Sequence, residues 1–232
     1  MISINRKIAT ALAFVMVACG DGSVPGADNL RVKETVQSDE RPAIVFLGTS
    51  LTAGLGVEKE EAYPAVIEDT VETLGFDVRV VNAGVSGETS TGGLQRIGWV
   101  LQTPVAVMVI ELGANDGLRG LSTDLMASNI QAIIDSTLAK YPDASIVLVG
   151  MQAPPNMGRE YTDAFASVFP ELAEVNGALL VPFLLEDVGG VAELNQGDQI
   201  HPTAEGHRIL ARNVWRVLGP HLNERFSLGV IN

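Results

Sequence analysis

The alternation of apolar runs with amphipathic segments is the feature that most constrains the fold of this 232-residue chain. From residue 42 onward, short and nearly continuous apolar runs are separated by longer segments with helical spacing. This is the βαβ pattern of a parallel sheet that helices cover on both faces. It predicts an α/β fold with a small, doubly wound parallel sheet. The five runs that we expect to form strands are AIVFLG (43–48), DVRVVNA (77–83), VAVMVIEL (105–112), ASIVLVGM (144–151) and ALLVPF (178–183).

Helical spacing is clearest in two segments. Residues 122–140 place a stripe of apolar side chains on one face, and Pro142 lies just beyond them. Thr203 can cap a last helix, which we expect to end at Gly219–Pro220. The length of the chain suits one domain with a buried core. We therefore expect the folded domain at residues 42–222 and a C-terminal tail at residues 223–232.

The first 18 residues have the composition of an export signal. Arg6 and Lys7 precede an apolar stretch from residue 8 to residue 18, which is too short to span a bilayer. Residues 16–19, MVAC, resemble the lipobox of bacterial lipoproteins, which implies that Cys19 is lipidated after cleavage. The alternative is an ordinary secretory peptide, or a membrane anchor, with an incidental cysteine. Because Cys19 is the single cysteine of the chain, an intramolecular disulfide is excluded.

Residues 19–41 contain few large apolar groups and mix Gly, Ser, Pro and charged residues without a sustained period, so we expect a flexible tether. Signal and tether together predict an exported protein of the cell envelope or periplasm, anchored to a membrane through Cys19. The chain carries 28 acidic and 15 basic residues, a formal net charge of −13. Nucleic acid and anionic lipid head groups are therefore poor electrostatic partners for the folded part.

Polar residues follow the ends of the predicted strands, which is where an open parallel sheet binds its ligand. Ser50 follows the first strand, Gly87 the second and Asn115 the third. Asp198 and His201 occur late in the chain, within the stretch GDQIHPTAEGH. Taken together, these residue types are the parts of a serine hydrolase.

Ser50, His201 and Asp198 are the candidate catalytic triad. A serine hydroxyl is a weak nucleophile until an adjacent base removes its proton. His201 is the predicted base because it lies in a loop, whereas His207 lies within the predicted last helix and His221 near the C-terminus. Asp198, three residues before His201, can accept the Nδ1 proton and favour the imidazolium that forms during catalysis.

Ester hydrolysis also needs hydrogen-bond donors for the oxyanion of the tetrahedral intermediate. We assign the backbone N–H groups of Ser50 and Gly87 and the side-chain amide of Asn115. Glycine allows close approach of the backbone, and asparagine offers two N–H donors on a short stem. The sequence contains no Cys/His cluster that would suggest a zinc site and no P-loop, so we expect no metal. Ser50 also does not lie in the G-x-S-x-G elbow of the α/β-hydrolases.

Each of these residues also has a purely structural interpretation. Ser50 could cap a helix, Gly87 could serve a turn, and Asn115 could belong to a turn or cap. Asp198 and His201 could form a hydrogen-bonded surface pair. Their occurrence in this order, at consecutive strand ends, favours the catalytic interpretation.

Several neighbouring residues are expected to be structural. Ser86, Thr89 and Ser90 are candidate caps for a helix that begins near residue 89, and Asp116 is a candidate support for the turn of Asn115. Met151, Met157 and residues 168–175 could line an acyl groove, although apolar residues in such segments more often belong to the core.

Four motifs resemble blocks I, II, III and V of the SGNH (GDSL-type) hydrolase family: Gly48-Thr49-Ser50-Leu51, Gly87, Gly113-x-Asn115-Asp116 and Asp198-x-x-His201. Stretches such as ELGANDGLRG and DQIHPTAEGH are similar to its bacterial subgroup of multifunctional acyl-thioesterases, lysophospholipases and arylesterases. The likeness covers about residues 43–220. Thr49 departs from the family motif, which has aspartate there. Because that position is not a triad member in the family, the change concerns substrate tuning more than catalysis.

The resemblance implies a flavodoxin-like, three-layer α/β/α sandwich with a five-stranded parallel sheet and the triad and oxyanion hole assigned above. It also implies hydrolysis of esters or thioesters through an acyl-enzyme, without a metal or organic cofactor. We expect aryl esters and lysophospholipid-like esters as substrates, with acyl thioesters as a further class. Two alternatives remain: an O-acetylesterase for carbohydrate or peptidoglycan, which a polar, open crevice would favour, and a binding lipoprotein without turnover.

Overall fold

The computed structural model describes residue 39 and residues 41–226. The predicted signal at residues 1–18, the lipidation site Cys19 and nearly all of the predicted tether lie outside the described residues. Residues 227–232, at the end of the predicted C-terminal tail, lie outside them as well. In the part that is described, none of the helices combines the length and the hydropathy needed to cross a membrane.

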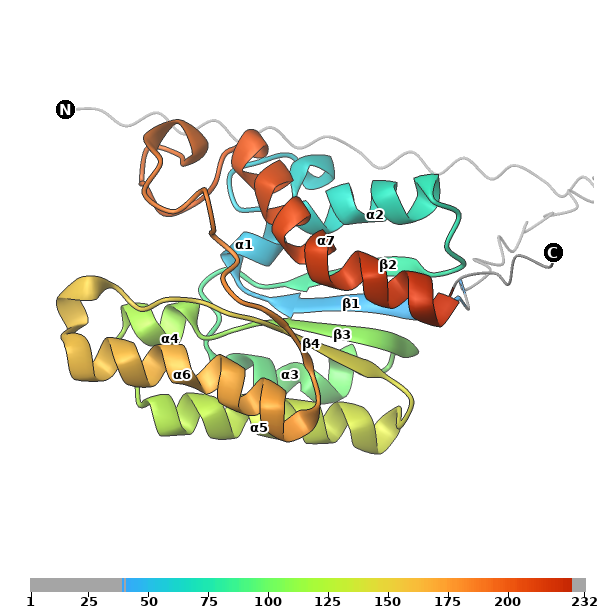
Figure 1. Cartoon of the computed structure of the whole chain (residues 1–232), viewed down its shortest axis with the longest axis horizontal. Coiled ribbons are helices and arrows are strands. Elements are labelled where there is room, and N and C mark those ends of the chain that lie inside the picture. Colours follow the sequence, from blue (N-terminus) through green and yellow to red (C-terminus); the bar gives the residue numbers. More distant parts are fainter. Residues whose placement is uncertain (1–38, 40, 227–232) are drawn as a thin grey trace, which may run out of the picture. The chain divides into compact units, whose positions relative to one another are not determined.

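The core of the fold is a five-stranded parallel sheet with the strand order β2-β1-β3-β4-β5. This is the flavodoxin-like order, and Figure 1 shows the strands side by side. Every residue of β1 and β3 is buried, as their apolar runs require. The prediction of five parallel strands is confirmed. The strands are β1 (Ala43–Gly48), β2 (Arg79–Gly84), β3 (Val105–Glu111), β4 (Ser145–Val149) and β5 (Leu179–Val181).

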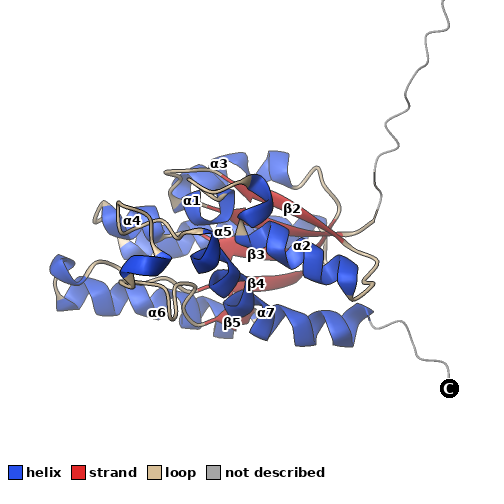
Figure 2. Ribbon diagram, turned by 90° about the horizontal axis from the view of Figure 1, so that it is seen from above, coloured by secondary structure: helices blue, strands red, loops and turns tan. Residues whose placement is uncertain are grey.

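Helices cover both faces of the sheet, which gives the expected three-layer α/β/α sandwich. In Figures 1 and 2, α2 and α7 lie on one face and α3, α5 and α6 on the other. The segment predicted at residues 122–140 is α5, which Ser122 caps by accepting a hydrogen bond from the Leu125 N–H. The helices are α1 (Ser50–Ala53), α2 (Tyr63–Thr73), α3 (Ser90–Val100), α4 (Ala114–Leu118), α5 (Thr123–Lys140), α6 (Arg159–Asn176) and α7 (Ala204–Phe226), with short 3₁₀ turns η1 (Lys59–Glu61), η2 (Pro155–Met157) and η3 (Ala192–Leu194).

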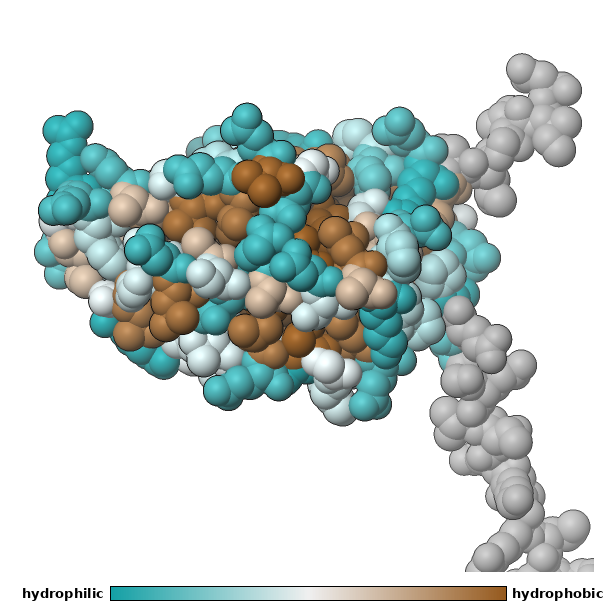
Figure 3. Space-filling model, turned by 90° about the horizontal axis from the view of Figure 1, so that it is seen from below, coloured by the Kyte–Doolittle hydropathy of each residue, from teal (hydrophilic) through white to brown (hydrophobic). Residues whose placement is uncertain are grey.

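The outer face of the molecule is not uniformly polar. Figure 3 shows apolar residues gathered in patches among polar ones on the face seen from below. Among the described residues, Trp99 of α3, Leu125 of α5 and Val175 of α6 are exposed large apolar side chains. Exposed apolar residues are therefore not confined to one place on the molecule.

The last helix is longer than the sequence predicts. Thr203 caps it as expected, accepting a hydrogen bond from the Gly206 N–H, but α7 runs through Pro220 and ends at Phe226. The prediction that it ends at Gly219–Pro220 is wrong, and so is the placing of residues 223–226 in a tail. Leu222 is fully buried, and the His221 and Arg225 side chains both hydrogen-bond Ser145 Oγ at the start of β4. These contacts offset the backbone hydrogen bond that proline cannot donate.

Candidate active site

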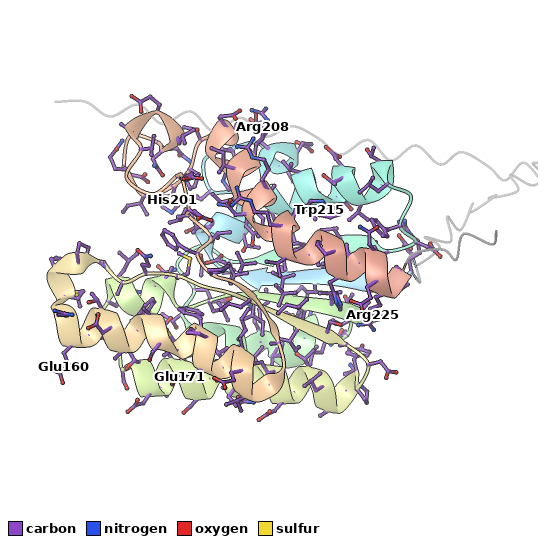
Figure 4. All side chains as sticks on the ribbon, viewed as in Figure 1. Glu160, Glu171, His201, Arg208, Trp215 and Arg225 are labelled. Atoms are coloured by element: carbon purple, nitrogen blue, oxygen red, sulfur yellow. The ribbon has the colours of Figure 1, made fainter. Side chains whose placement is uncertain are left out.

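The five predicted site residues meet at the carboxyl edge of the sheet. Ser50 begins α1 directly after β1, Gly87 lies between β2 and α3, and Asn115 lies in α4 after β3. Asp198 and His201 lie on the loop before α7, and Figure 4 shows His201 on this loop, beside α1. Strands β2 and β3 lie on opposite sides of β1, so the order of the strands reverses at β1. Open parallel sheets bind their ligands at such a topological switch point.

Ser50, His201 and Asp198 form a continuous hydrogen-bonded chain. His201 Nε2 is 2.9 Å from Ser50 Oγ, and His201 Nδ1 is 2.6 Å from Asp198 Oδ2. Ser50 is buried as a residue, whereas nearly half of the Asp198 side chain is exposed. This is the arrangement in which an imidazole can take the serine proton while the carboxylate holds its other nitrogen.

Asp198 is held in place by its own turn. Its Oδ1 accepts hydrogen bonds from the backbone N–H groups of Ile200, at 2.9 Å, and His201, at 3.0 Å. The side-chain hydrogen bond from His201, followed by these two backbone hydrogen bonds, holds the pKa of Asp198 well below its usual range. Asp198 is therefore a carboxylate at neutral pH and can orient the ring of His201.

The turn that carries Ser50 is short because α1 is a single turn. Thr49 is its extended N-cap residue, and Gly54, at φ +74°, ends it in the left-handed conformation that glycine adopts without strain. The Thr49 side chain does not cap α1, because it donates a hydrogen bond to Glu111 instead. Ser50 therefore lies in a tight turn at the end of a buried strand, and hydrogen bonds to Glu111 hold this turn.

The predicted oxyanion donors surround the same space. Asn115 Nδ2 donates one hydrogen bond to the Glu88 carbonyl at 3.0 Å, which leaves its second N–H for a ligand. Within residues 41–226, neither the Ser50 N–H nor the Gly87 N–H is engaged by another protein group. Gly87 has φ +78°, and a Cβ atom there would have ample room, so backbone conformation rather than crowding favours glycine.

A second set of contacts fixes the loops that carry Gly87 and Asn115. Asp116 accepts hydrogen bonds from the Ser90 N–H at 2.8 Å and the Ser90 hydroxyl at 2.6 Å, which joins α4 to the start of α3. Of the three candidate caps, Thr89 caps α3, Ser90 instead binds Asp116, and Ser86 lines the pocket beside Ser50. Asp116 therefore supports the site through α3.

Two supporting residues escaped the sequence analysis. Gln196 Nε2 donates to the Leu55 carbonyl at 2.7 Å and to the Pro202 carbonyl at 2.9 Å, so it connects the loop after α1 to the loop of His201. Glu111 ends β3 beneath Thr49 and is fully buried. Two sequence signals mark it: it is a lone acidic residue inside the run VAVMVIEL, and it is the first residue of the family-like stretch ELGANDGLRG.

The site opens into a pocket of about 510 Å³ whose walls are mostly apolar. Met151 lines it, whereas Met157 and residues 168–175 do not. Among the described residues, no three His, Cys, Asp or Glu side chains are grouped so that they could hold a metal ion. The pocket is lined by Thr49, Ser50, Leu51, Leu55, Ser86, Gly87, Ala114, Asn115, Leu118, Met151, Gln152, Ala153, Pro154, Pro155, Leu185, Gly190, Ile200 and His201.

A parallel α/β/α sandwich with a hydrogen-bonded Ser–His–Asp chain at its carboxyl edge has the fold and the geometry of a serine hydrolase. A model of the GDSL-like Lipase/Acylhydrolase family matches residues 46–209. The chain belongs to this family, which confirms the resemblance seen in its motifs. Membership places it among the carboxylic ester hydrolases.

Individual relatives agree with this placement. Esterase TesA of Pseudomonas aeruginosa is 39% identical over 180 residues, covering 77% of this chain and 89% of its own, and the Arylesterase of Vibrio mimicus is 38% identical over 181 residues with the same coverage. The crystal structure of TesA superposes with a TM-score of 0.73 and covers 77% of this chain and 98% of that one. The psychrotrophic esterase EstA from Pseudoalteromonas sp., solved in a form inhibited by monoethylphosphonate, has the same TM-score at 33% identity, covering 78% of this chain and 98% of its own.

Proposed function

We propose that this protein hydrolyses carboxylic esters with an apolar acyl group through an acyl-enzyme on Ser50. The observation that carries the proposal is the chain of 2.9 Å and 2.6 Å hydrogen bonds from Ser50 through His201 to Asp198, opening into a mostly apolar pocket. Aryl esters and lysophospholipid-like esters are the substrate classes. Acyl thioesters are a further class, in keeping with a relative named "Thioesterase 1/protease 1/lysophospholipase L1" from Escherichia coli, which is 32% identical over 190 residues, covering 82% of this chain and 89% of its own.

In the first half of the reaction, Ser50 Oγ attacks the carbonyl carbon while its proton passes to His201 Nε2. Asp198 stabilises the resulting imidazolium through Nδ1. The carbonyl oxygen becomes an oxyanion, and the Ser50 and Gly87 N–H groups and the second N–H of Asn115 donate to it. Collapse of the intermediate breaks the ester C–O bond, and His201 returns the proton to the departing alkoxide.

In the second half, water replaces the alcohol. His201 Nε2 takes a proton from the water as it attacks the acyl carbon, and the same donors hold the second oxyanion. Breakage of the bond to Ser50 Oγ releases the acid, and the proton on His201 restores the serine hydroxyl. No other group is required to move a proton in either half.

The lining of the pocket favours acyl chains over sugars. A carbohydrate O-acetylesterase would need polar side chains to hydrogen-bond the hydroxyl groups of a sugar, because desolvating them unpaired is costly. Here Leu55, Leu118 and Ile200 line the pocket and each is about half exposed. Such side chains can bury the methylene groups of an acyl chain, at about 0.8 kcal/mol for each group.

The test is hydrolysis of p-nitrophenyl esters from acetyl to lauroyl by the protein and its Ser50→Ala variant. We expect kcat/KM to rise with acyl length until the pocket is filled, and turnover to be abolished by the substitution. A sharp optimum at acetyl would favour the O-acetylesterase. No turnover by either protein would contradict ester hydrolysis and favour a binding role.

We also propose that the protein is exported and held at a membrane by lipid on Cys19, which rests on the sequence of residues 1–41 alone. The net charge of the folded part argues against binding to anionic lipid by charge, so a covalent anchor is the simplest means of attachment. Cells expressing the protein should incorporate labelled palmitate into it, and Cys19→Ser should abolish the label and release the activity from the membrane fraction. Activity that stays in the membrane fraction with Cys19→Ser would contradict the anchor.

A further inference from the structure

Glu111 is a buried acidic residue that the proposed chemistry leaves unused. It is the last residue of β3, pairs in register with Gly48 of β1, and has no exposed surface. Within the described part of the chain, no lysine, arginine or histidine forms an ion pair with it. A buried carboxylate without a cation is costly unless its oxygens accept hydrogen bonds.

Those hydrogen bonds come from both sides of Ser50. Glu111 Oε2 accepts from the Thr49 backbone N–H at 2.9 Å and from the Thr52 hydroxyl at 2.8 Å, and the Thr49 hydroxyl lies 3.0 Å from both carboxylate oxygens. Thr52 Oγ1 is in turn 2.8 Å from the Tyr63 hydroxyl of α2. An ionised carboxylate can accept from all three donors, whereas a protonated one has to donate from one oxygen.

We propose that Glu111, in its ionised form, is a positioning residue for ester hydrolysis: by binding Thr49 and Thr52 it holds the turn between them so that Ser50 Oγ meets His201 and the Ser50 N–H faces the pocket. The inference rests on the proposed function, since it concerns the alignment of the same serine. Glu111 does not line the pocket and acts only through this turn.

The close packing beneath the turn of residues 49–52 leaves little room for the turn to adopt another conformation. A Cβ atom at Gly48 would clash with Thr52 Oγ1 and Glu111 Oε2, so these atoms occupy the space directly under the strand end. If Glu111 lost its acceptors, the Thr49 N–H would be buried without a partner, and the turn would have to move to satisfy it. A shift of about 1 Å in a nucleophile can cost about 100-fold in rate.

Thr49 is suited to this role in a way that aspartate is not. Its N–H and its hydroxyl both donate to Glu111. An ionised aspartate at this position has no side-chain proton to donate and would place a second negative charge beside a buried carboxylate.

The arrangement also makes the turn sensitive to pH. Burial raises the pKa of Glu111 to about 7, although the hydrogen bonds from Thr49 and Thr52 oppose the rise. The titratable groups that face this network are Tyr63 on α2, whose hydroxyl binds Thr52, and His207 on α7, which stacks on the Tyr63 ring. Burial keeps both of these groups neutral near pH 7, because it raises the pKa of Tyr63 and lowers that of His207 to about 4.

The first experiment compares kcat and KM of Glu111→Gln with those of the unaltered protein on one p-nitrophenyl ester. A glutamine fills the same volume but turns an NH₂ group toward at least one donor. We expect kcat to fall about 100-fold while KM changes less than about threefold, because the pocket wall is unchanged. A matched pair at Thr52, which donates to Glu111 and does not line the pocket, guards against misfolding. Thr52→Val should lose about tenfold in kcat, whereas Thr52→Ser, which keeps the hydroxyl, should lose little.

The second readout is the pH profile of kcat/KM. On the acid side, protonation of Glu111 should lower the rate, so the acid limb of log kcat/KM against pH should be steeper, by up to about one unit of slope, in the unaltered protein than in Glu111→Gln. A folded Glu111→Gln protein that retains kcat, or an acid limb of identical shape in both proteins, would overturn the inference. Loss of turnover in Ser50→Ala with full activity in Glu111→Gln would refute this inference and leave the proposed function intact, whereas turnover retained in Ser50→Ala would refute the proposed function itself.

Discussion

The two carboxylate oxygens of Asp198 have different hydrogen-bond partners, and the role of this residue depends on both. Oδ1 is occupied by the N–H groups of Ile200 and His201, and Oδ2 faces His201 Nδ1. In Asp198→Asn the amide oxygen has to take the place of Oδ1, because backbone N–H groups can only donate. The NH₂ group then faces Nδ1, which places the histidine proton on Nε2, where it blocks acceptance of the Ser50 proton.

We therefore predict that Asp198→Asn lowers kcat by about 10³–10⁴-fold while the protein stays folded. Steady-state kinetics on a p-nitrophenyl ester measures this fall in kcat. Asp163→Asn, at an exposed position in α6, is the control and should keep full activity. An Asp198→Asn protein that retains a tenth of the turnover would show that the tautomer of His201 does not depend on Asp198.

The buried carboxyl of Glu111 predicts an opposition between stability and activity. Its pKa is raised from 4.5 to about 7, so the folded protein holds a proton that the unfolded chain releases between these values. The stability that this proton contributes is fully present below pH 4.5 and is lost as the pH rises through 7, a change of roughly 3 kcal/mol. Activity, by contrast, needs the ionised form.

Urea denaturation at several pH values tests this prediction. Between pH 5 and pH 8, the free energy of unfolding of Glu111→Gln should rise relative to the unaltered protein by roughly 2–3 kcal/mol, and the difference should be constant above that range. The titration of His207 cancels because both proteins contain it. A difference that does not vary with pH would mean that Glu111 is ionised throughout.

Among the secondary-structure elements, the strands follow directly from the sequence and the end of α7 does not. Runs such as AIVFLG have enough apolar side chains to be buried on both faces, and β1 occupies these same residues, 43–48. The end of α7 depends instead on Ser145, 76 residues before His221, and on the burial of Leu222. The expectation that proline ends a helix rests on local backbone preference and takes no account of such long-range contacts.

Leu222→Ala should destabilise the protein by about 2–4 kcal/mol, since it removes a fully buried side chain beyond Pro220. Leu74→Ala, at an exposed position just after α2, is the matched control and should change stability by less than about 0.5 kcal/mol. Chemical denaturation measures both. Equal and small effects would mean that the last turns of α7 are not part of the folded core.

The residues of the active site also divide into those that the sequence predicts and those that depend on long-range contacts. Ser50, Gly87, Asn115, Asp198 and His201 could be predicted because each follows a strand end or forms a local pair, and parallel strands bring their carboxyl ends together. The roles of Gln196 and Glu111 could not, since Gln196 contacts Leu55 across 141 residues and Glu111 contacts Thr49 across 62. The pocket lining likewise depends on how separate loops meet.

Gln196 makes a prediction for the loop that carries His201. Gln196→Ala removes hydrogen bonds to the Leu55 and Pro202 carbonyls, and we expect kcat to fall about tenfold and stability by about 1–3 kcal/mol. Gln199→Ala is the control, because its side chain bonds only the Gln196 carbonyl of the same loop. Equal kcat values for the two variants would show that the loop of His201 does not need this connection.

Taken as a whole, the molecule has an apolar pocket and a complete set of hydrolytic groups at one edge of its sheet. Ser50 and Asn115 follow the two central strands β1 and β3, whose buried register fixes the distance between them. His201 comes from the far end of the chain and completes the set only when α7 is in place. We therefore expect this assembly to make Ser50, and no other serine, a nucleophile.

Reaction with a fluorophosphonate, followed by mass spectrometry of the intact protein and its peptides, identifies the nucleophilic serine. We expect a single adduct on Ser50, formed at least about 100-fold more slowly in His201→Ala and absent from Ser50→Ala. An adduct that persists in Ser50→Ala, or no adduct on the unaltered protein at all, would contradict it.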